Sequence, residues 1–276
     1  MNPQEALEAW ARITMLIEND WGEKGTGFLV KPAINVNGSS YIKFFLVSCK
    51  HVLNRDAKLR EQAEEITIYP LVRQSSGSMQ REPISLNLRY EDGSQVWRGH
   101  PDPDVDVIVF DVTDLIINDM RTEHGAPGLE VFVSGEWIKR LGITTNDAVT
   151  TIGFPDMGRS ETSDPVFRSG TISTSLGKRI EFQNEKGGCA LRAFVVDGEA
   201  IPGSSGSPVL LKPTVGRVIS GRNYFGMSVP PVLLGVLAET TYAKVEYESF
   251  SGWTYSRMGI AFDADTILDT IKLYVG

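Results

Sequence analysis

The chain has 276 residues, of which 22% are charged, and a formal net charge of −8 at pH 7. Its length allows a large apolar core, because roughly 70–75% of the surface of an unfolded chain of this size is buried on folding. The negative charge argues against a basic surface that grips nucleic acid, and no apolar run approaches the ~18 residues that a membrane helix needs.

The N-terminal segment predicts a short helix over residues 4–12, where good helix formers follow an Asn-Pro start. This segment lacks the basic start and apolar centre of a secretory signal. We therefore expect a cytoplasmic protein without a membrane partner.

Beyond this helix, short apolar or β-branched runs alternate with Gly, Pro, Asn and Asp, which is typical of a barrel or a sandwich. Asn37-Gly38 lies between two such runs and predicts a tight hairpin. The runs are ITMLIE, GFLVKP, YIKFFLVSC, EITIYPLV, ISLNLRY, DVIVFDV, AVTTIGF, GTISTSL, ALRAFVV, SPVLLK, LLGVLAETT and MGIAFDA.

The pattern loosens over residues 114–145, which we expect to form the seam between two halves. A helix is predicted there near GEWIKRLG. After the last strand, Asp263 or Asp265 can cap a closing helix that carries an apolar side.

Metal ligands are scarce in this sequence. It holds three histidines and two cysteines, with no Cys-x-x-Cys or His-x-x-x-His spacing. We expect no metal and no cofactor. A Cys49–Cys189 disulfide is possible in principle, but two distant cysteines do not resemble a secreted disulfide framework.

The stretch IPGSSGSPVLL over Ile201–Leu211 is either an ordinary turn or the site of a nucleophilic serine. A serine hydroxyl needs an adjacent base and a carboxylate that orients that base. His51 ends an apolar run and Asp106 begins another, so both are expected at strand ends. Alone, each is more often a structural residue.

Together, these segments resemble the trypsin-like serine peptidases, in particular the bacterial branch similar to HtrA-type protease domains, here without a PDZ domain. The resemblance implies two antiparallel six-stranded β-barrels of the chymotrypsin-like fold in one peptidase domain over 1–276. The barrels would span about 13–118 and 145–262, and the C-terminal helix about 263–274. The segments that carry it are GTGFLV, FFLVSCKHVL, DVDVIVF, TIGFP, PVFRSGTIST, DGEAIPGSSGSPVL, LLGVLAE and MGIAFDA.

The same resemblance implies roles for individual residues. The family order His, Asp, Ser falls on His51, Asp106 and Ser205, with Ser205 as the nucleophile. The N–H groups of Gly203 and Ser205 would form the oxyanion hole. Ser204 replaces the aspartate that takes part in zymogen activation in the digestive branch, so activation of that kind is not expected.

Substrate contacts are implied at Glu199, Ala238, Glu239 and Thr240. The two glutamates would favour a basic side chain before the cleaved bond, and a small or medium apolar side chain is the alternative.

The resulting expectation is a serine endopeptidase that acts on protein or peptide substrates through an acyl-enzyme, with a regulatory partner left open. One alternative is an inactive pseudoprotease that only binds peptides. The other is an esterase that uses the same residues.

Overall fold

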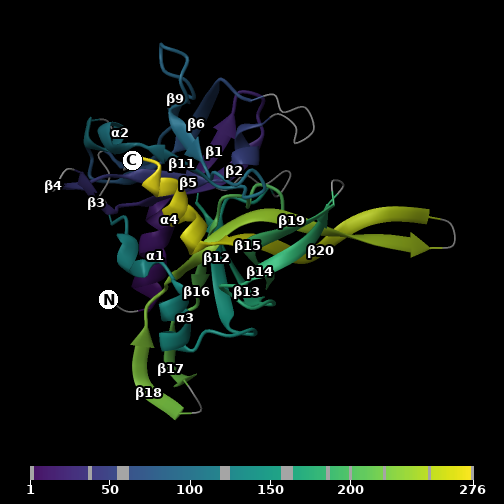
Figure 1. The fold of residues 1–276 in the computed structure, drawn as a ribbon. Helices are drawn as coiled ribbons and strands as arrows, with labels where there is room; N and C mark the ends of the chain where they lie inside the picture. Colours follow the sequence, from purple (N-terminus) through teal and green to yellow (C-terminus); the bar gives the residue numbers. More distant parts are fainter. Residues whose placement is uncertain are drawn as a thin grey trace.

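The computed structural model describes residues 3–36, 39–54, 62–118, 125–156, 164–184, 187–198, 201–219, 222–247 and 250–274. These residues form two large antiparallel sheets, one from each half of the chain, and the N-terminal half is at the top of Figure 1. The predicted all-β, chymotrypsin-like fold is confirmed.

The first sheet has seven strands in the order β10-β11-β5-β2-β1-β6-β9. Its edges meet only through an isolated bridge between Arg89 and Gln95, because the chain turns back sharply at Gly93 between β9 and β10. The first unit is therefore a half-barrel, whereas the sequence predicted a six-stranded barrel. Its strands are β1 (Thr14–Asn19), β2 (Lys24–Val30), β5 (Phe45–Ser48), β6 (Glu65–Tyr69), β9 (Ile84–Asn87), β10 (Trp97–Gly99) and β11 (Ile108–Asp111).

The second sheet also has seven strands, in the order β13-β12-β16-β19-β20-β15-β14. An additional pairing of β13 with β15 closes the first six of these strands into a ring. This ring matches the predicted six-stranded barrel. Its strands are β12 (Ala148–Gly153), β13 (Val166–Ile172), β14 (Arg179–Asn184), β15 (Gly187–Asp197), β16 (Pro208–Leu211), β19 (Leu233–Tyr247) and β20 (Phe250–Asp263).

Three small hairpins accompany the sheets. In the first, the pairing of Val36 with Ser39 leaves two residues for the turn, as the Asn-Gly pair predicts, although the turn residues lie outside the described part. The third hairpin and the outer part of β19–β20 project from the second barrel (Figure 1). The hairpin strands are β3 (Ala33–Val36), β4 (Ser39–Ile42), β7 (Leu71–Arg73), β8 (Met79–Arg81), β17 (Thr214–Ile219) and β18 (Arg222–Val229).

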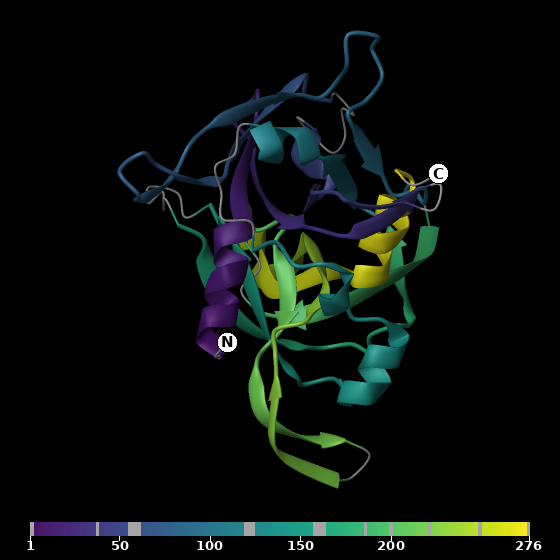
Figure 2. The ribbon, with the colours of Figure 1, turned by 90° about the vertical axis from the view of Figure 1, so that its left-hand side faces the viewer.

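Four α-helices complete the described structure: α1 (Pro3–Ile13), α2 (Thr113–Asn118), α3 (Gly135–Leu141) and α4 (Ala264–Lys272). The predicted N-terminal, central and C-terminal helices correspond to α1, α3 and α4. Single 3₁₀ turns lie at η1 (Lys50–Leu53) and η2 (Leu129–Val131). None of the helices in the described ranges is long and apolar enough to cross a bilayer. Figure 2 shows α1 and α4 on opposite sides of the junction between the two halves.

The junction between the halves is itself apolar. Strand β16 is buried on both faces: Val209 belongs to the interior of the second barrel, while Leu210 belongs to a core that is continuous with the first sheet. Because successive residues of a strand point to opposite faces, a strand buried on both sides reads as a continuous apolar run. This explains the sequence PVLL, and it fixes the two halves against each other.

Candidate active site

His51 is positioned by the end of a fully buried strand. Strand β5 ends at Ser48, and the chain then enters η1, which contains His51. The His51 side chain is 38% exposed, although Val52 and Leu53 beside it are buried. The sequence prediction of a histidine that projects from a strand end is consistent with this placement.

Asp106 lies beside His51 because of the register of the sheet. Strand β11 pairs antiparallel with β5, and Ile108 lies opposite Ser48. The chain just before Ile108 therefore runs next to the chain just after Ser48. Asp106 Oδ1 accepts a hydrogen bond of 3.1 Å from the His51 backbone N–H, and Asp106 Oδ2 bonds His51 Nδ1.

The loop that carries Asp106 is held by Lys50. The Lys50 ammonium donates to the carbonyl oxygens of His100 at 3.1 Å and Asp102 at 3.2 Å. Burial lowers the pKa of Lys50, and the nearby carboxylates, with Asp106 first among them, oppose that change. Lys50 thus holds the loop at His100 and Asp102, while Asp106 of the same loop contacts His51.

Ser205 lies in a tight loop between β15 and β16. Its Oγ donates to the carbonyl oxygen of Ala238 at 3.0 Å, and its own carbonyl accepts from Thr26 N at 2.7 Å. The neighbouring Gly206 N–H donates to Leu237 O at 2.7 Å. Ser205 is therefore held between strand β19 of its own barrel and strand β2 of the first half.

Cys49 connects the two sides of the site. Its thiol is fully buried and donates to the same Leu237 carbonyl, at 3.4 Å, that accepts from Gly206. Burial raises the pKa of Cys49 well above its usual value, and Asp106 adds to this effect. A thiol with a raised pKa is a poor nucleophile, so Cys49 serves as packing.

The backbone around Ser205 bends at two glycines. Gly203 has φ +82° and Gly206 has φ +91°, a region that other residues rarely adopt. Ser204 N–H donates to Ile201 O at 3.1 Å. Within the described ranges, the N–H groups of Gly203 and Ser205 have no acceptor. These are the two amides that the sequence assigned to an oxyanion hole.

The predicted substrate contacts are described only in part. Ala238 lies in β19, is 1% exposed, and takes part through its carbonyl oxygen. Glu239 and Thr240 continue the same strand, and their side chains lie outside the described part of the chain. Glu199 also lies outside it. Their roles in substrate binding stay predictions.

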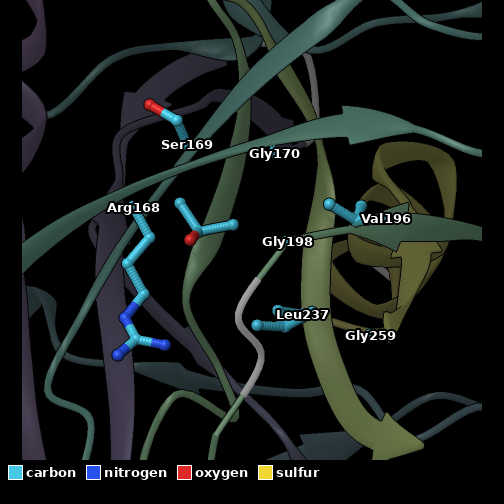
Figure 3. A pocket seen from close by; sticks show the side chains of 8 residues that line it. Arg168, Ser169, Gly170, Val196, Gly198, Leu237 and Gly259 are labelled. Carbon is cyan, nitrogen blue, oxygen red and sulfur yellow. The ribbon is translucent and has the colours of Figure 1, made fainter. Parts of the chain in front are cut away.

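A small cavity opens beside Leu237 and Gly198 (Figure 3), with Arg168 and Val196 on opposite sides. The space open to the centre of a water molecule is only ≈ 10 Å³, about one water. In this conformation it is too small for a long side chain. The remaining lining residues are Thr151, Ser169, Gly170 and Gly259.

Ligand atoms that could hold a metal gather in one place among the described residues. One atom from each of Cys49, His51 and Asp106 lies within 4.8 Å of the others. His51 and Asp106 already bond each other there. The expectation of a metal-free site stays a prediction.

Comparison with known proteins identifies the family. A family model described as the trypsin-like peptidase domain matches residues 25–219, which is most of the chain. The chain belongs to the trypsin-like peptidases. A comparison with curated protein sequences found no match.

Solved structures of HtrA-type and related proteases resemble this trypsin-like peptidase in fold. The active form of the Rv3671c protease from M. tuberculosis is 13% identical, with a TM-score of 0.53 over 97% of this chain and 82% of that one. Deg5 is 17% identical, with a TM-score of 0.51 over 99% and 93%. The HtrA-type protease AlgW with a tripeptide is 14% identical, with a TM-score of 0.50 over 100% and 64%. At these identities the likeness concerns the fold.

The loop of residues 201–207, which carries Ser205, is called the serine loop below. Sequence reasoning missed the residues of this trypsin-like peptidase that hold the serine loop in place. Thr26 bonds both Gly203 and Ser205, and Asp156 N–H donates to Pro202 O at 2.7 Å. Thr26 stood inside the GTGFLV motif, which was the only signal available. Asp156 acts through its backbone, which leaves no trace in the residue type.

Proposed function

We propose that this trypsin-like peptidase is a serine endopeptidase in which Ser205 is the nucleophile, His51 the general base and Asp106 the residue that orients His51. The observation that carries the proposal is the two-point contact of Asp106 with His51. One carboxylate oxygen receives the backbone N–H and the other receives Nδ1. This arrangement fixes the ring and leaves Nε2 as the basic nitrogen.

The proposed reaction begins when Ser205 Oγ leaves Ala238 O by rotation about the Cα–Cβ bond and turns to His51. His51 Nε2 takes the hydroxyl proton as Oγ attacks the peptide carbonyl. The developing oxyanion is stabilised by the N–H groups of Gly203 and Ser205, each of which contributes roughly 3–4 kcal/mol. His51 then gives its proton to the leaving amine, and the acyl-enzyme forms on Oγ.

Water completes the cycle. His51, neutral again after the amine leaves, takes a proton from water, which attacks the acyl carbon, and Ser205 Oγ recovers its proton from His51. Asp106 remains a carboxylate throughout and stabilises the charged ring in both halves of the reaction.

In this proposal an extended substrate adds to β19 beyond Val236, where the pairing of this strand with β16 ends. A peptide that adds to a sheet edge bonds through its backbone, and Ala238 O, the acceptor that Ser205 now uses, lies on that strand. Substrate binding would therefore compete with the Ser205 hydroxyl for this oxygen and favour its rotation towards His51.

The same hydrogen bond supports a second candidate, the peptide-binding pseudoprotease. A Ser205 hydroxyl that stays on Ala238 O is not activated by His51, yet the strand edge would still bind an extended peptide. The two candidates differ in whether Ser205 reacts.

The deciding experiment treats the protein and its Ser205→Ala variant with a fluorophosphonate probe and maps the adduct by mass spectrometry. The proposal predicts a single adduct on Ser205 and none in the variant. In a parallel assay, hydrolysis of esters but not of peptides by the untreated protein would favour an esterase. A protein that takes no probe yet binds peptides would favour the pseudoprotease.

A further inference from the structure

Thr26 is a buried side chain of the first half that contacts the serine loop. It lies in β2, is 0% exposed, and stands between Gly25 and Gly27. A Cβ at Gly25 would lie 2.6 Å from Val52, and one at Gly27 would lie 2.7 Å from Ile17. These two neighbours face side chains of the first half itself, whereas Thr26 points to the other face of the strand and towards the serine loop.

Every polar group of Thr26 is engaged at this junction. Its Oγ1 donates to Gly203 O at 2.9 Å and accepts from Phe154 N–H at 2.9 Å. Its N–H donates to Ser205 O at 2.7 Å, and its carbonyl accepts from Ser48 Oγ at 2.7 Å. A single residue thus joins β2, β5, the end of β12 and the serine loop.

Two of these bonds hold the carbonyl oxygens of Gly203 and Ser205, the residues whose N–H groups are the candidate oxyanion donors. Gly203 O and Ser205 O both bind Thr26, while Pro202 O binds Asp156 N–H at 2.7 Å. The Pro202 bond fixes the peptide plane that carries the Gly203 N–H, and a bond of 3.0 Å from Ser207 N–H to Ser204 O fixes the plane that carries the Ser205 N–H. The two Thr26 bonds fix the neighbouring planes, Gly203–Ser204 and Ser205–Gly206, and so hold the whole loop against β2.

The serine loop is packed tightly against its neighbours. A Cβ at Gly206 would lie 1.8 Å from Thr26 O, and one at Gly203 would lie 2.5 Å from Phe154 O. The loop therefore lies in backbone contact with β2 on one side and with the segment after β12 on the other.

Thr26 also connects the loop to the His51 side of the site. Ser48, which donates to Thr26 O, ends the strand that leads into the turn carrying His51. One path from base to nucleophile therefore runs through this buried threonine, in addition to the one through Cys49 and Leu237 O. Misplacement of reacting groups by about 1 Å can reduce the rate about 10²-fold.

We propose that Thr26 is a positioning residue, which holds the Gly203–Ser205 loop in register with His51 through its hydroxyl group. This inference rests on the proposed function, but it concerns a residue outside the His51, Asp106 and Ser205 set.

The test compares Thr26→Val, which keeps the shape and removes the hydroxyl, with Thr26→Ser, which keeps the hydroxyl. For peptide hydrolysis and fluorophosphonate labelling, we expect kcat and the labelling rate to fall about 10²-fold in Thr26→Val with little change in KM. Thr26→Ser should stay within about threefold of the parent. Thermal unfolding of all variants checks that the loss does not follow general stability.

Equal labelling rates in Thr26→Val and the parent would overturn the proposal, as would an equal loss in both variants. If Thr26→Val does not fold, Thr26→Ala removes the same hydroxyl with a smaller side chain and should show the same fall in kcat at nearly constant KM. An unchanged kcat in that variant would also count against the proposal.

Hydrogen exchange separates failure of this proposal from failure of the proposed function. If the parent itself takes no probe, the serine endopeptidase proposal fails. The exchange of backbone amides over 201–207 then decides the role of Thr26. Faster exchange in Thr26→Val than in Thr26→Ser supports the positioning role, and equal exchange rejects it.

Discussion

The two halves of this trypsin-like peptidase contribute to the candidate site in different ways. The half-barrel supplies side chains, since His51 and Asp106 bond each other from adjacent strand ends. The closed barrel supplies the Ser205 side chain together with a backbone loop that offers the Gly203 and Ser205 amides and is fixed through its carbonyls. The first half therefore depends on residue identity, and the second depends also on a loop conformation that only small residues permit.

We expect the largest single effect on activity from a substitution in the half-barrel, at Asp106. Asp106→Asn removes the negative charge and changes the tautomer that His51 adopts, so kcat should fall about 10⁴-fold with KM little changed. Steady-state hydrolysis of a peptide substrate measures this loss. Asp104→Asn, an exposed aspartate of the same loop, is the control and should retain activity. A loss below tenfold in Asp106→Asn would remove Asp106 from the site.

Activity should be almost as sensitive to one methyl group added to the loop of the closed barrel. In Gly203→Ala the new Cβ would lie 2.5 Å from Phe154 O, at φ +82°. Loss of one oxyanion donor reduces kcat about 10²–10³-fold, which we expect here. Gly93→Ala is the matched control, since Gly93 has φ +81° with nothing within 4 Å of a Cβ. Similar kcat values for the two variants would contradict the role of Gly203.

Stability of the closed barrel should depend on pH through Asp263, at the junction of β20 and α4. Burial raises its pKa from 3.8 to about 6, and Asp265 adds to the effect. The folded state therefore binds this proton more tightly than the unfolded state does. Stability from this group is present below pH 4 and is lost as the pH rises through 6, which corresponds to about 3 kcal/mol at neutral pH.

The variant Asp263→Asn, which carries no charge, should remove this fall and raise the free energy of unfolding at pH 7. Urea unfolding from pH 4 to 8 measures the effect, with the exposed Asp114→Asn as the control. A parallel pH profile for Asp263→Asn and the parent would show that Asp263 is not the titrating group.

The smallest effect concerns the contact between the halves at the C-terminal helix. Tyr274, just after α4, donates its hydroxyl to Val109 O of β11 at 2.8 Å. Tyr274→Phe should reduce the free energy of unfolding by about 1 kcal/mol. Tyr90→Phe, at a position that is 57% exposed, should change it little. Equal unfolding midpoints for the two variants would argue against this contact.

The difference between the halves also explains what the sequence could predict. The sequence could propose His51, Asp106 and Ser205 because the proposed chemistry requires these types of side chain and because their order resembles that of the trypsin-like peptidases. The Thr26 hydroxyl could not be proposed in this way, because its bond to Gly203 spans 177 residues and any buried threonine has the same sequence appearance. Bonds between backbone groups, such as Asp156 N–H to Pro202 O, leave no sequence signal at all.

Within the fold, apolar runs predicted most strands of both sheets, but they missed the edge strands β10 and β14. The hairpin of β17 and β18 and the outer half of β19–β20 were also missed. These segments project from the barrel (Figure 1) and have mixed polar and aromatic sequences that do not read as core strands. Closure of the first barrel was also overpredicted, because the pairing of edge strands depends on the turn that joins them.

The Tyr274 contact has a consequence for the order of assembly. The residues it joins are 165 positions apart, so the half-barrel is synthesised long before α4. The apolar junction at Leu210 and the Thr26 bonds can join the two halves before α4 docks, and Tyr274 then adds a last bond between chain segments from opposite ends of synthesis.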